Sequence, residues 1–584
     1  MTEVSGQVAG RDTRCKVVPP ILVVWKRIRM RPVARDLPRR RGCEEDSIGF
    51  PGIKKIRCHG LVRPVVIAKR YMVLLVLVLA MSPYFIRLAY SPTLQLHDDA
   101  YYYFKIARNI AAGHGSTFDT LSFTNGYHPL WMAICVSLAT FVTKSNVYVY
   151  CILVINLLFI VLLSHRLFAM TVESLGVYFA GFLVCLVNWS LYTNLNLLSG
   201  LETALYLYIV LIVVDLLPRV TWTSKRDLLT LGVLLALAFL ARTDFVLFFP
   251  VLAVYFFLFG PRKSIGLYRL LACWLMLPMA LIVTPYLAWN YFETGHFEQL
   301  SGLVQSLHKT NLPVSSAILN ALKDLTKGIL LRPLYLNAFM AVWLCLCGWA
   351  VLKGKSLVSQ FKDVRLFLLT GFSVVLFSYY FMNYADLMRA WHIMIPWVTS
   401  QILLVHLLKG LWEAVAQRLA LRIVVLVLTL LMCINYFTQI PLWTLHARTV
   451  DPYFLTSTNY YKELADWMRN NLPPGAKIAV CNAGYIGFFS DRTIINLDGL
   501  VNGTEFYHYL KDGRGRWQFA FDKKLDYFAD HFFGPPDAAF PPEVRRRMKL
   551  VHTVGRKDVL LAGRPTYVDA YVWKIDHSDV PAER

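Results

Sequence analysis

The chain has 584 residues, of which 56% are hydrophobic and 17% are charged, with a mean hydropathy of +0.47. Soluble domains carry about 25% charged residues, so this composition excludes a disordered chain and argues against a soluble enzyme. A net charge of +23 would ordinarily suggest a nucleic-acid partner. Cytoplasmic loops of membrane proteins also collect Lys and Arg, and we therefore expect a polytopic α-helical membrane protein without a nucleic-acid partner.

The first 70 residues form a basic segment with 17 Lys and Arg against 6 Asp and Glu, which is +11 of the total charge. It contains no apolar run followed by a small-residue cleavage site. Three interpretations compete: a disordered tail against the anionic inner leaflet, a nucleic-acid-binding arm, or non-native sequence ahead of a later start such as Met72. We favour the first or the third, and all three place residues 1–70 in the cytoplasm.

Apolar runs dominate residues 71–450. A membrane helix needs about 20 mostly apolar residues, and eleven stretches approach this length with the help of flanking residues. They are Tyr71–Ile86, Val147–Leu163, Leu175–Trp189, Leu197–Leu217, Leu228–Leu240, Phe245–Phe259, Leu270–Asn290, Leu336–Leu352, Leu366–Met382, Ile393–Leu408 and Ile423–Phe437.

A twelfth apolar stretch, Leu130–Val142, decides the orientation. If it lies along the membrane without crossing, the basic loops between the crossings all fall on the cytoplasmic side, as the distribution of Lys and Arg requires. These loops contain His165/Arg166, Arg219–Arg226, Arg262/Lys263, Lys353–Arg365 and Lys409–Arg422. The sequence thus predicts eleven crossings of the inner (plasma) membrane, with the N-terminus inside and the C-terminus outside.

Residues 451–584 have the composition of a soluble domain. An amphipathic helix is predicted first, and a Pro-Pro-Gly sequence ends it; short apolar or alternating runs then predict strands. The predicted helix is Tyr460–Asn471, and the predicted strands are Lys477–Cys481, Arg492–Asp498 and Tyr567–Ile575. We expect a small α/β domain, which the parity of the crossings places outside the cytoplasm.

The first outer loop, residues 91–146, carries polar groups that are unusual beside a membrane helix. Asp98 and Asp99 are adjacent, and two neighbouring carboxylates suit a general base because repulsion and burial raise one pKa. They could equally ligate a divalent cation, and a helix cap by either one is compatible with both roles. The same loop also contains His97, His114, Asn125 and His128.

Further polar groups are predicted on the same face, at the ends of later helices. They are Glu202, Arg242, Asp244, Lys309, Arg389 and His392. An ion pair at a helix end is the ordinary role for Arg242 with Asp244. Together these groups place at least three cations beside two carboxylates, which suits an anionic substrate that reacts through a base. Phosphate is the anion that Arg and Lys bind most readily.

Three segments resemble the GT-C superfamily of membrane glycosyltransferases: His97–Asn109, Asn125–Trp131 and Ser199–Thr203. The likeness is greatest to family 39-like bacterial enzymes related to the protein mannosyltransferases and the aminoarabinose transferases. It spans residues 70 to 500 approximately and includes Gly484–Phe489 and Asp498–Val501. The basic N-terminal segment lies outside it.

The resemblance implies a polyprenyl-phosphate sugar as donor, used at the extracytoplasmic face. It implies Asp98 as the catalytic carboxylate, with Asp99 beside it, and basic residues on the donor phosphate. No motif marks those basic residues, and Arg389, Lys309 and Arg242 are candidates by position alone. Contacts to the donor or acceptor are assigned by position to His97, His114, Asn125, His128, Glu202, Asp244 and His392. No metal ligand is assigned, and a divalent cation stays open. A single displacement would invert the anomeric centre.

The chain has no glycine-rich nucleotide-binding motif, which agrees with a donor that already carries a phosphate leaving group. The sequence predicts an integral membrane glycosyltransferase, hexosyl or pentosyl, that acts on an envelope glycan, lipid or protein. One alternative is a transporter or flippase for lipid or polysaccharide, which would need charges near mid-membrane and an internal repeat. Another is a non-catalytic envelope-assembly factor.

Overall fold

The structure is a computed structural model that describes residues 62–90, 96–259, 265–307, 363–384, 389–415, 417–427, 457–533, 540–561 and 564–578, with 429, 430, 434 and 438. The chain divides into Met1–Val65 and Val66–Arg584, and the fold below is that of the second unit. The predicted crossing Leu336–Leu352 lies outside the described residues, and Ile423–Phe437 lies partly outside them.

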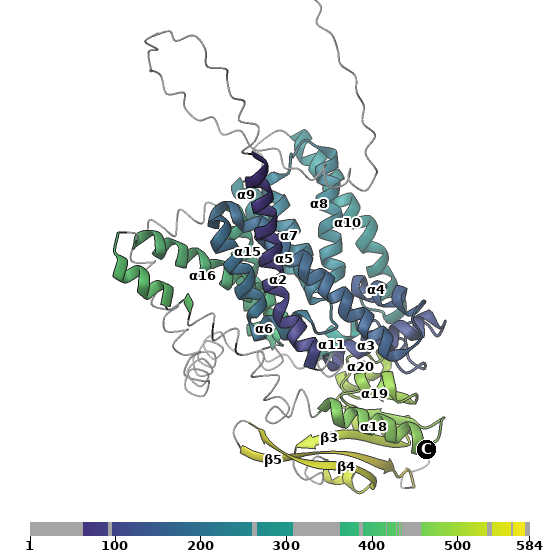
Figure 1. Ribbon diagram of the computed structural model, residues 1–584. Helices are drawn as coiled ribbons and strands as arrows, with labels where there is room; N and C mark the ends of the chain where they lie inside the picture. Colours follow the sequence, from purple (N-terminus) through teal and green to yellow (C-terminus); the bar gives the residue numbers. More distant parts are fainter. Residues whose placement is uncertain are drawn as a thin grey trace, which may run out of the picture. The chain divides into compact units, whose positions relative to one another are not determined.

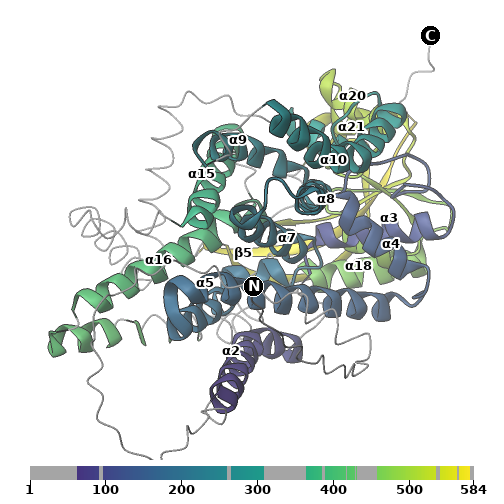
Figure 2. The same cartoon turned by 90° about the horizontal axis from the view of Figure 1, so that it is seen from above.

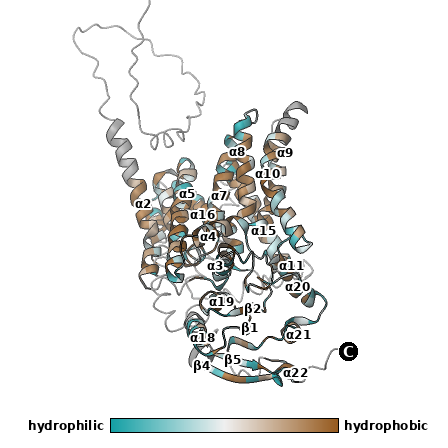
Figure 3. Cartoon of the chain, turned by 90° about the vertical axis from the view of Figure 1, so that its right-hand side faces the viewer, coloured by the Kyte–Doolittle hydropathy of each residue, from teal (hydrophilic) through white to brown (hydrophobic). Residues whose placement is uncertain are grey.

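Helices make up the larger part of this unit (Figure 1), and apolar residues dominate them (Figure 3). They are α2 (Val62–Tyr90), α3 (Asp98–Ala111), α4 (Pro129–Ala139), α5 (Ser145–Trp189), α6 (Leu191–Leu197), α7 (Thr203–Leu216), α8 (Lys225–Ala241), α9 (Phe248–Phe259), α10 (Ile265–Thr294), α11 (Leu300–Ser306), α15 (Val364–Tyr384) and α16 (Met394–Ala414), with the short 3-10 turns η1 (Leu217–Arg219), η2 (Thr243–Leu247) and η4 (Ala390–Ile393).

Five of the described helices are long and apolar enough to span a membrane: those containing Met72–Ala89, Ser145–Trp189, Cys273–Thr294, Val364–Asn383 and Trp391–Ala414. The chain is therefore a membrane protein, while the number of eleven crossings stays a prediction. Helix α7 lies among α5, α8, α15 and α16 and packs against each of them (Figure 2). Its side chains are almost all buried, so it forms the centre of the helical part.

Helix α5 is a helical hairpin. Gly176 has φ 79° and ψ 168°, which interrupts the helical backbone. The Nδ2 atom of Asn188 donates a hydrogen bond of 3.1 Å to the Oγ atom of Ser164. These residues would be about 36 Å apart on one straight helix, so the chain reverses between them. The two arms correspond to the predicted segments Val147–Leu163 and Leu175–Trp189.

Two predicted segments differ from the simple picture of spanning helices. The run predicted to begin at Leu197 is interrupted, because α7 begins only at Thr203, and the intervening turn holds Glu202. Helix α4, the apolar stretch that we predicted not to cross, has 11 residues. At 1.5 Å per residue it is about 16 Å long, which is too short for a bilayer core of about 30 Å.

The C-terminal part is an α/β domain with one five-stranded sheet in the order β2-β1-β3-β5-β4. Strand β1 runs parallel to β2 and β3, and β5 is antiparallel to β3 and β4. The predicted helix and three predicted strands are present, whereas β3 and β4 were not predicted. The elements are α18 (Ser457–Asn471), β1 (Lys477–Val480), α19 (Gly484–Phe489), β2 (Thr493–Asn496), α20 (Thr504–Lys511), α21 (Gly515–Asp522), β3 (Tyr527–Phe533), α22 (Pro542–Arg545), β4 (Met548–Leu561) and β5 (Arg564–Ile575).

The α/β domain contacts the helical part through its short helices. Helix α19 packs against α3, and α20 packs against α11. Figure 1 shows α19 and α20 between the helical part and strands β3 to β5. Tyr101 of α3 contributes much of this contact, since its ring lies against the rings of Tyr485, Phe488 and Phe489. The start of α3 is therefore fixed against both parts of the protein.

The hairpin of α5 predicts a specific cost for a side chain at Gly176. The Gly176→Ala variant should lose about 1–3 kcal/mol of unfolding free energy, because only glycine adopts this region of φ and ψ without strain. Unfolding in detergent with increasing SDS would measure the loss. Gly302→Ala is the matched control, since Gly302 lies in α11 and an added Cβ would meet nothing within 4 Å. Equal stability of the two variants would contradict the strained turn.

Candidate active site

The three segments that carry the family resemblance meet at one place. The backbone N–H of His97, just before α3, donates to the carbonyl of Ser199 at 3.3 Å. The indole N–H of Trp131 donates to the carbonyl of Gly200 at 3.0 Å, and the N–H of Gly200 donates to the Asn156 side chain at 2.9 Å. The turn before α7 is thus held by α3, α4 and α5, and it places Glu202 beside α3.

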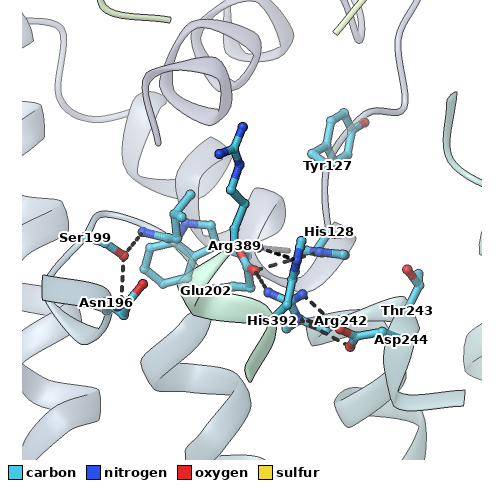
Figure 4. A network of polar contacts seen from close by, with 12 residues as sticks. Tyr127, His128, Asn196, Ser199, Glu202, Arg242, Thr243, Asp244, Arg389 and His392 are labelled. Atoms are coloured by element: carbon cyan, nitrogen blue, oxygen red, sulfur yellow. Dashed lines mark hydrogen bonds and ion pairs between the residues drawn. The ribbon is translucent and has the colours of Figure 1, made fainter. Parts of the chain in front are cut away.

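A buried ion network lies where α3 meets α7, α8 and α15 (Figure 4). Arg242 donates to Glu202 at 3.0 Å and forms several hydrogen bonds with Asp244, the shortest at 2.9 Å. Tyr103 of α3 donates to the second oxygen of Glu202 at 3.2 Å, and Tyr380 of α15 donates to Asp244 at 2.9 Å. Arg242 and Glu202 are each only 3% exposed, so the network is a structural link between helices.

This geometry favours the ion pair for Arg242 over the phosphate ligand that we also considered. Its guanidinium already contacts two carboxylates, which leaves it little capacity for a further anion. Glu202 and Asp244 are occupied in the same way and are poor candidates for contact with the acceptor. His128 lies at the edge of the network, with its Nε2 atom 3.8 Å from Glu202 and its side chain 19% exposed.

Asp98 connects α3 with the α/β domain. Its two carboxylate oxygens accept hydrogen bonds from the backbone N–H groups of Gly484 at 2.9 Å and Tyr485 at 2.8 Å. These are N–H groups of the first turn of α19, which lack partners within their own helix. A Cβ at position 484 would lie 2.0 Å from the Asp98 carbonyl oxygen, so only glycine permits this contact. Burial nevertheless raises the pKa of Asp98 to about 6.

The adjacent carboxylate, Asp99, is left available. It is half-buried, and no residue in the described part of the chain donates a hydrogen bond to it. The pKa of Asp99 is raised to about 7, chiefly by burial and also by the charges of Asp98 and Glu202, while the charge of Arg389 lowers it. A carboxyl group with a pKa near 7 and a free oxygen is suited to accept a proton at neutral pH.

Arg389 is an exposed cation whose charge acts on Asp99. It precedes η4, and its backbone N–H donates to the Nδ1 atom of His392 at 3.2 Å. The ring of His392 is stacked on Tyr380, with centroids 4.3 Å apart, and the ring of His97 lies edge-on to Trp391. In Figure 4 the guanidinium of Arg389 points away from the ion network, so it can bind an anion.

The other predicted site residues do not join this group. Asn125 is fully buried. Its Nδ2 atom donates to the Oδ1 atom of Asn290 at 3.1 Å, and its Oδ1 atom accepts from the N–H of Leu300 at 2.9 Å. Asn125 thus links its loop to two helices. His114 is exposed in the loop that follows α3, and no described residue connects its side chain with the carboxylates. Lys309 lies outside the described residues.

One acidic residue was quoted for the resemblance but received no role. Asp498 follows β2, and its Oδ2 atom accepts a hydrogen bond of 2.9 Å from the hydroxyl of Tyr102 on α3. Burial raises the pKa of Asp498 to about 7, and the charge of Asp99 adds to the effect. The sequence signal was the Asp-Gly pair after a predicted strand, which locates a turn but gives no partner for it.

A divalent cation at the start of α3 stays a prediction. Both oxygens of Asp98 are engaged by backbone amides, so Asp98 and Asp99 do not form a chelating pair. Within the part of the chain that the structure describes, no three His, Cys, Asp or Glu residues are grouped to hold a metal ion.

The fold is shared with solved structures of low sequence identity. One similar structure is that of ArnT from Cupriavidus metallidurans, bound to undecaprenyl phosphate. It has 12% identity and a TM-score of 0.50, and the match covers 87% of this chain and 98% of that chain. AglB from Archaeoglobus fulgidus, an oligosaccharyltransferase in complex with an inhibitory peptide and a dolichol-phosphate, has 12% identity and a TM-score of 0.49, over 79% and 69% of the two chains.

Sequence comparisons add less. Residues 450–569, within the α/β domain and the segment before it, match a family model described as "Domain of unknown function (DUF8728)". A comparison with curated proteins finds no match. The fold is therefore shown by the structure, and the activity must be argued from the site.

The ion network predicts that Arg242 and Arg389 differ in their contribution to stability. Arg242→Met should cost about 3–5 kcal/mol of unfolding free energy, because it leaves two buried carboxylates without a counter-charge. The same change at exposed Arg389 should cost less than about 0.5 kcal/mol. Unfolding of both variants in detergent would compare them, and equal losses would show that Arg242 is no structural link.

Proposed function

We propose that the protein is a membrane glycosyltransferase that moves a sugar from a polyprenyl-phosphate donor to an acceptor in the cell envelope. The observation that carries the proposal is the pair at the start of α3. Asp98 is held by the amides of α19, while Asp99 has a raised pKa and an available carboxylate beside Arg389. A base and a cation side by side suit a reaction in which a hydroxyl loses a proton and a phosphate leaves.

In the proposed step, Asp99 takes the proton of an acceptor hydroxyl as the acceptor oxygen attacks the anomeric carbon of the donor sugar. The bond between that carbon and the phosphate oxygen breaks, and the polyprenyl phosphate departs with the electron pair. Arg389 stabilises the charge that develops on the departing phosphate. A single displacement of this kind inverts the anomeric centre. The geometry favours Asp99 as the base, and it makes Asp98 the residue that positions it.

Two further observations support a lipid-linked donor. The fold is shared with an enzyme whose structure contains undecaprenyl phosphate, and the chain has no glycine-rich nucleotide-binding motif. The charge distribution of the loops supports a cytoplasmic N-terminus, an extracytoplasmic α/β domain and the inner (plasma) membrane as location. The acceptor class, glycan, lipid or protein, follows from neither observation.

The roles of the two aspartates can be separated. Asp99→Asn should lower sugar transfer by about 10²–10⁴-fold, as expected for the loss of a general base, without lowering the unfolding temperature. Asp98→Asn should lower the unfolding temperature as well, because an amide NH₂ group would face the backbone N–H groups of Gly484 and Tyr485. Transfer would be measured from radiolabelled polyprenyl-phosphate sugars in membranes. Wild-type transfer by Asp99→Asn would exclude Asp99 as the base.

Arg389 is expected to act on the donor phosphate. Arg389→Gln should weaken binding of undecaprenyl phosphate at least tenfold, which removes about 1.4 kcal/mol of binding free energy. The measurement is the rise in unfolding temperature that the lipid produces in detergent, since a ligand of the folded state stabilises it. Arg516→Gln, at an exposed arginine of the α/β domain, is the control. An unchanged lipid-induced rise for Arg389→Gln would remove Arg389 from the donor site.

A further inference from the structure

A second cluster of charged side chains lies at the other end of the membrane helices from the candidate active site. Helix α7 begins after Glu202 and contains Asp215 in its last turn. At 1.5 Å per residue, these two carboxylates are about 20 Å apart along the helix. Arg365, at the start of α15, donates to Asp215 at 3.4 Å, whereas Tyr380, near the end of α15, belongs to the ion network of the candidate active site. The basic loops at the Asp215 end are those predicted to lie in the cytoplasm.

Asp215 is the centre of this cluster. Its side chain is only 1% exposed, and three arginines contact its carboxylate oxygens with a guanidinium nitrogen: Arg166 of α5 at 2.5 Å, Arg219 of η1 at 2.8 Å and Arg365 at 3.4 Å. Asp363 pairs with Arg365 at 2.8 Å. Three arginines thus share two carboxylates that are buried or half-buried, so Arg166 and Arg219 share the one charge of Asp215.

The other charged groups in this part of the described chain lie nearer to solvent. Glu173 is 4.0 Å from Arg365, but its side chain is 66% exposed. Lys409 of α16 donates to the carbonyl of Ser174 at 2.6 Å and pairs with Glu413, whose side chain is 64% exposed. Exposed ion pairs contribute little free energy, so these two glutamates leave the arginines able to attract a further anion.

Two of the arginines are partly accessible. The side chain of Arg166 is 22% exposed and that of Arg219 is 34% exposed. A guanidinium has five N–H donors, and the Nε atom of Arg166 is buried without a hydrogen-bond partner in the described part of the chain. An unpaired buried donor costs free energy. Phosphate is an anion that guanidinium groups bind well, and these two arginines are suited to hold one between them.

The end of helix α9 adjoins the arginines. The hydroxyl of Tyr255 donates to the carbonyl of Leu217 at 3.4 Å, two residues before Arg219. The ring of Phe259 lies against that of Phe367 in the first turn of α15, with centroids 5.7 Å apart. The end of α9 therefore contacts both η1 and the start of α15, the two elements that supply Arg219 and Arg365.

This end of α9 presents apolar side chains outward. Phe257 is 82% exposed, and Leu258 and Phe259 are 48% and 49% exposed. A free phosphate ion gains nothing from such a surface, whereas a phospholipid has its acyl chains directly beside its phosphate. Basic sites between membrane helices on the cytoplasmic side are suited to anionic lipid headgroups. The combination of arginines and exposed apolar side chains therefore favours a lipid over a free anion.

We propose that Arg166, Arg219 and Arg365 form a binding site for the phosphate group of an anionic phospholipid of the cytoplasmic leaflet, whose acyl chains lie along the end of α9. The lipid bridges the ends of α5, α7 and α15 that Asp215 already links, and it stabilises the helical part of the protein. The inference goes beyond the proposed function and does not rest on it, because the two sites are at opposite ends of α7.

The test is thermal unfolding of the full-length protein in a neutral detergent, with added dioleoylphosphatidylglycerol, dioleoylphosphatidylcholine or inorganic phosphate. A ligand of the folded state raises the unfolding temperature. For the wild type, the concentration that gives half of the full rise should be about fivefold lower for phosphatidylglycerol than for phosphatidylcholine, because only the former has a net negative charge. Inorganic phosphate alone should give no rise.

Arg219→Gln is the variant that tests the site, since Asp215 keeps two other arginines and the fold is retained. It should raise the half-maximal concentration of phosphatidylglycerol about fivefold, the factor expected for one arginine beside an anionic lipid. Arg226→Gln is the matched control, because Arg226 is an exposed arginine of the same predicted cytoplasmic loop. It should leave that concentration unchanged, and so should Arg389→Gln at the proposed donor site.

Equal half-maximal concentrations of the two lipids in the wild type overturn the proposal without the use of any variant. An unchanged response of Arg219→Gln to phosphatidylglycerol overturns it as well. A rise with inorganic phosphate as large as that with phosphatidylglycerol would assign the arginines to a free anion and exclude the lipid. A response lost in Arg389→Gln and kept in Arg219→Gln would place the lipid at the donor site instead.

Discussion

The hydrogen bonds between the Asp98 carboxylate and the amides of Gly484 and Tyr485 set the geometry of the candidate site. They join the first turn of α3 to the first turn of α19, and each helix supplies what the other lacks. The amides have no partner within their own helix, and a carboxylate leaving water needs hydrogen bonds to offset its desolvation. Gly484 permits the close approach. With this contact in place, the start of α3 is fixed against α19, and Asp99 follows directly in the chain.

The charged groups on the two sides of α3 differ in how their charge is compensated. Toward the membrane helices, Arg242 is enclosed by Glu202 and Asp244, and tyrosines complete their hydrogen bonds. Toward the α/β domain, Asp98 and Asp498 are held by neutral donors, and burial raises their pKa values. A compensated ion network makes a rigid support, whereas uncompensated carboxylates hold protons near neutral pH. Asp99 follows Asp98 on the same helix. Its backbone is therefore held in place, while its carboxyl group can gain or lose a proton near neutral pH.

Much of the fold followed from local sequence patterns, because long apolar runs and alternating strands are local features. The helix from Ser457 and the strand from Lys477 were predicted within a few residues. The pattern missed β4, whose pairing with β5 includes two register shifts. It also extended a helix through residues 198–202, because the turn is short and apolar residues follow it directly. The hydrogen-bonding role of Asp98 could not be predicted from local sequence patterns, since its partners lie 386 and 387 positions later in the chain.

That sequence separation has a consequence for the making of the protein. During synthesis, α3 reaches the membrane long before the strands that approach it exist. A chain still attached to the ribosome, or cut before Gly484, would have its helices and its basic loops but no partner for Asp98 or Tyr102. The candidate site is assembled only by the last quarter of the polypeptide, so it cannot be complete before that part has been synthesised. Because this contact joins an early residue to a late one, a chain that ends before Gly484 cannot form the site.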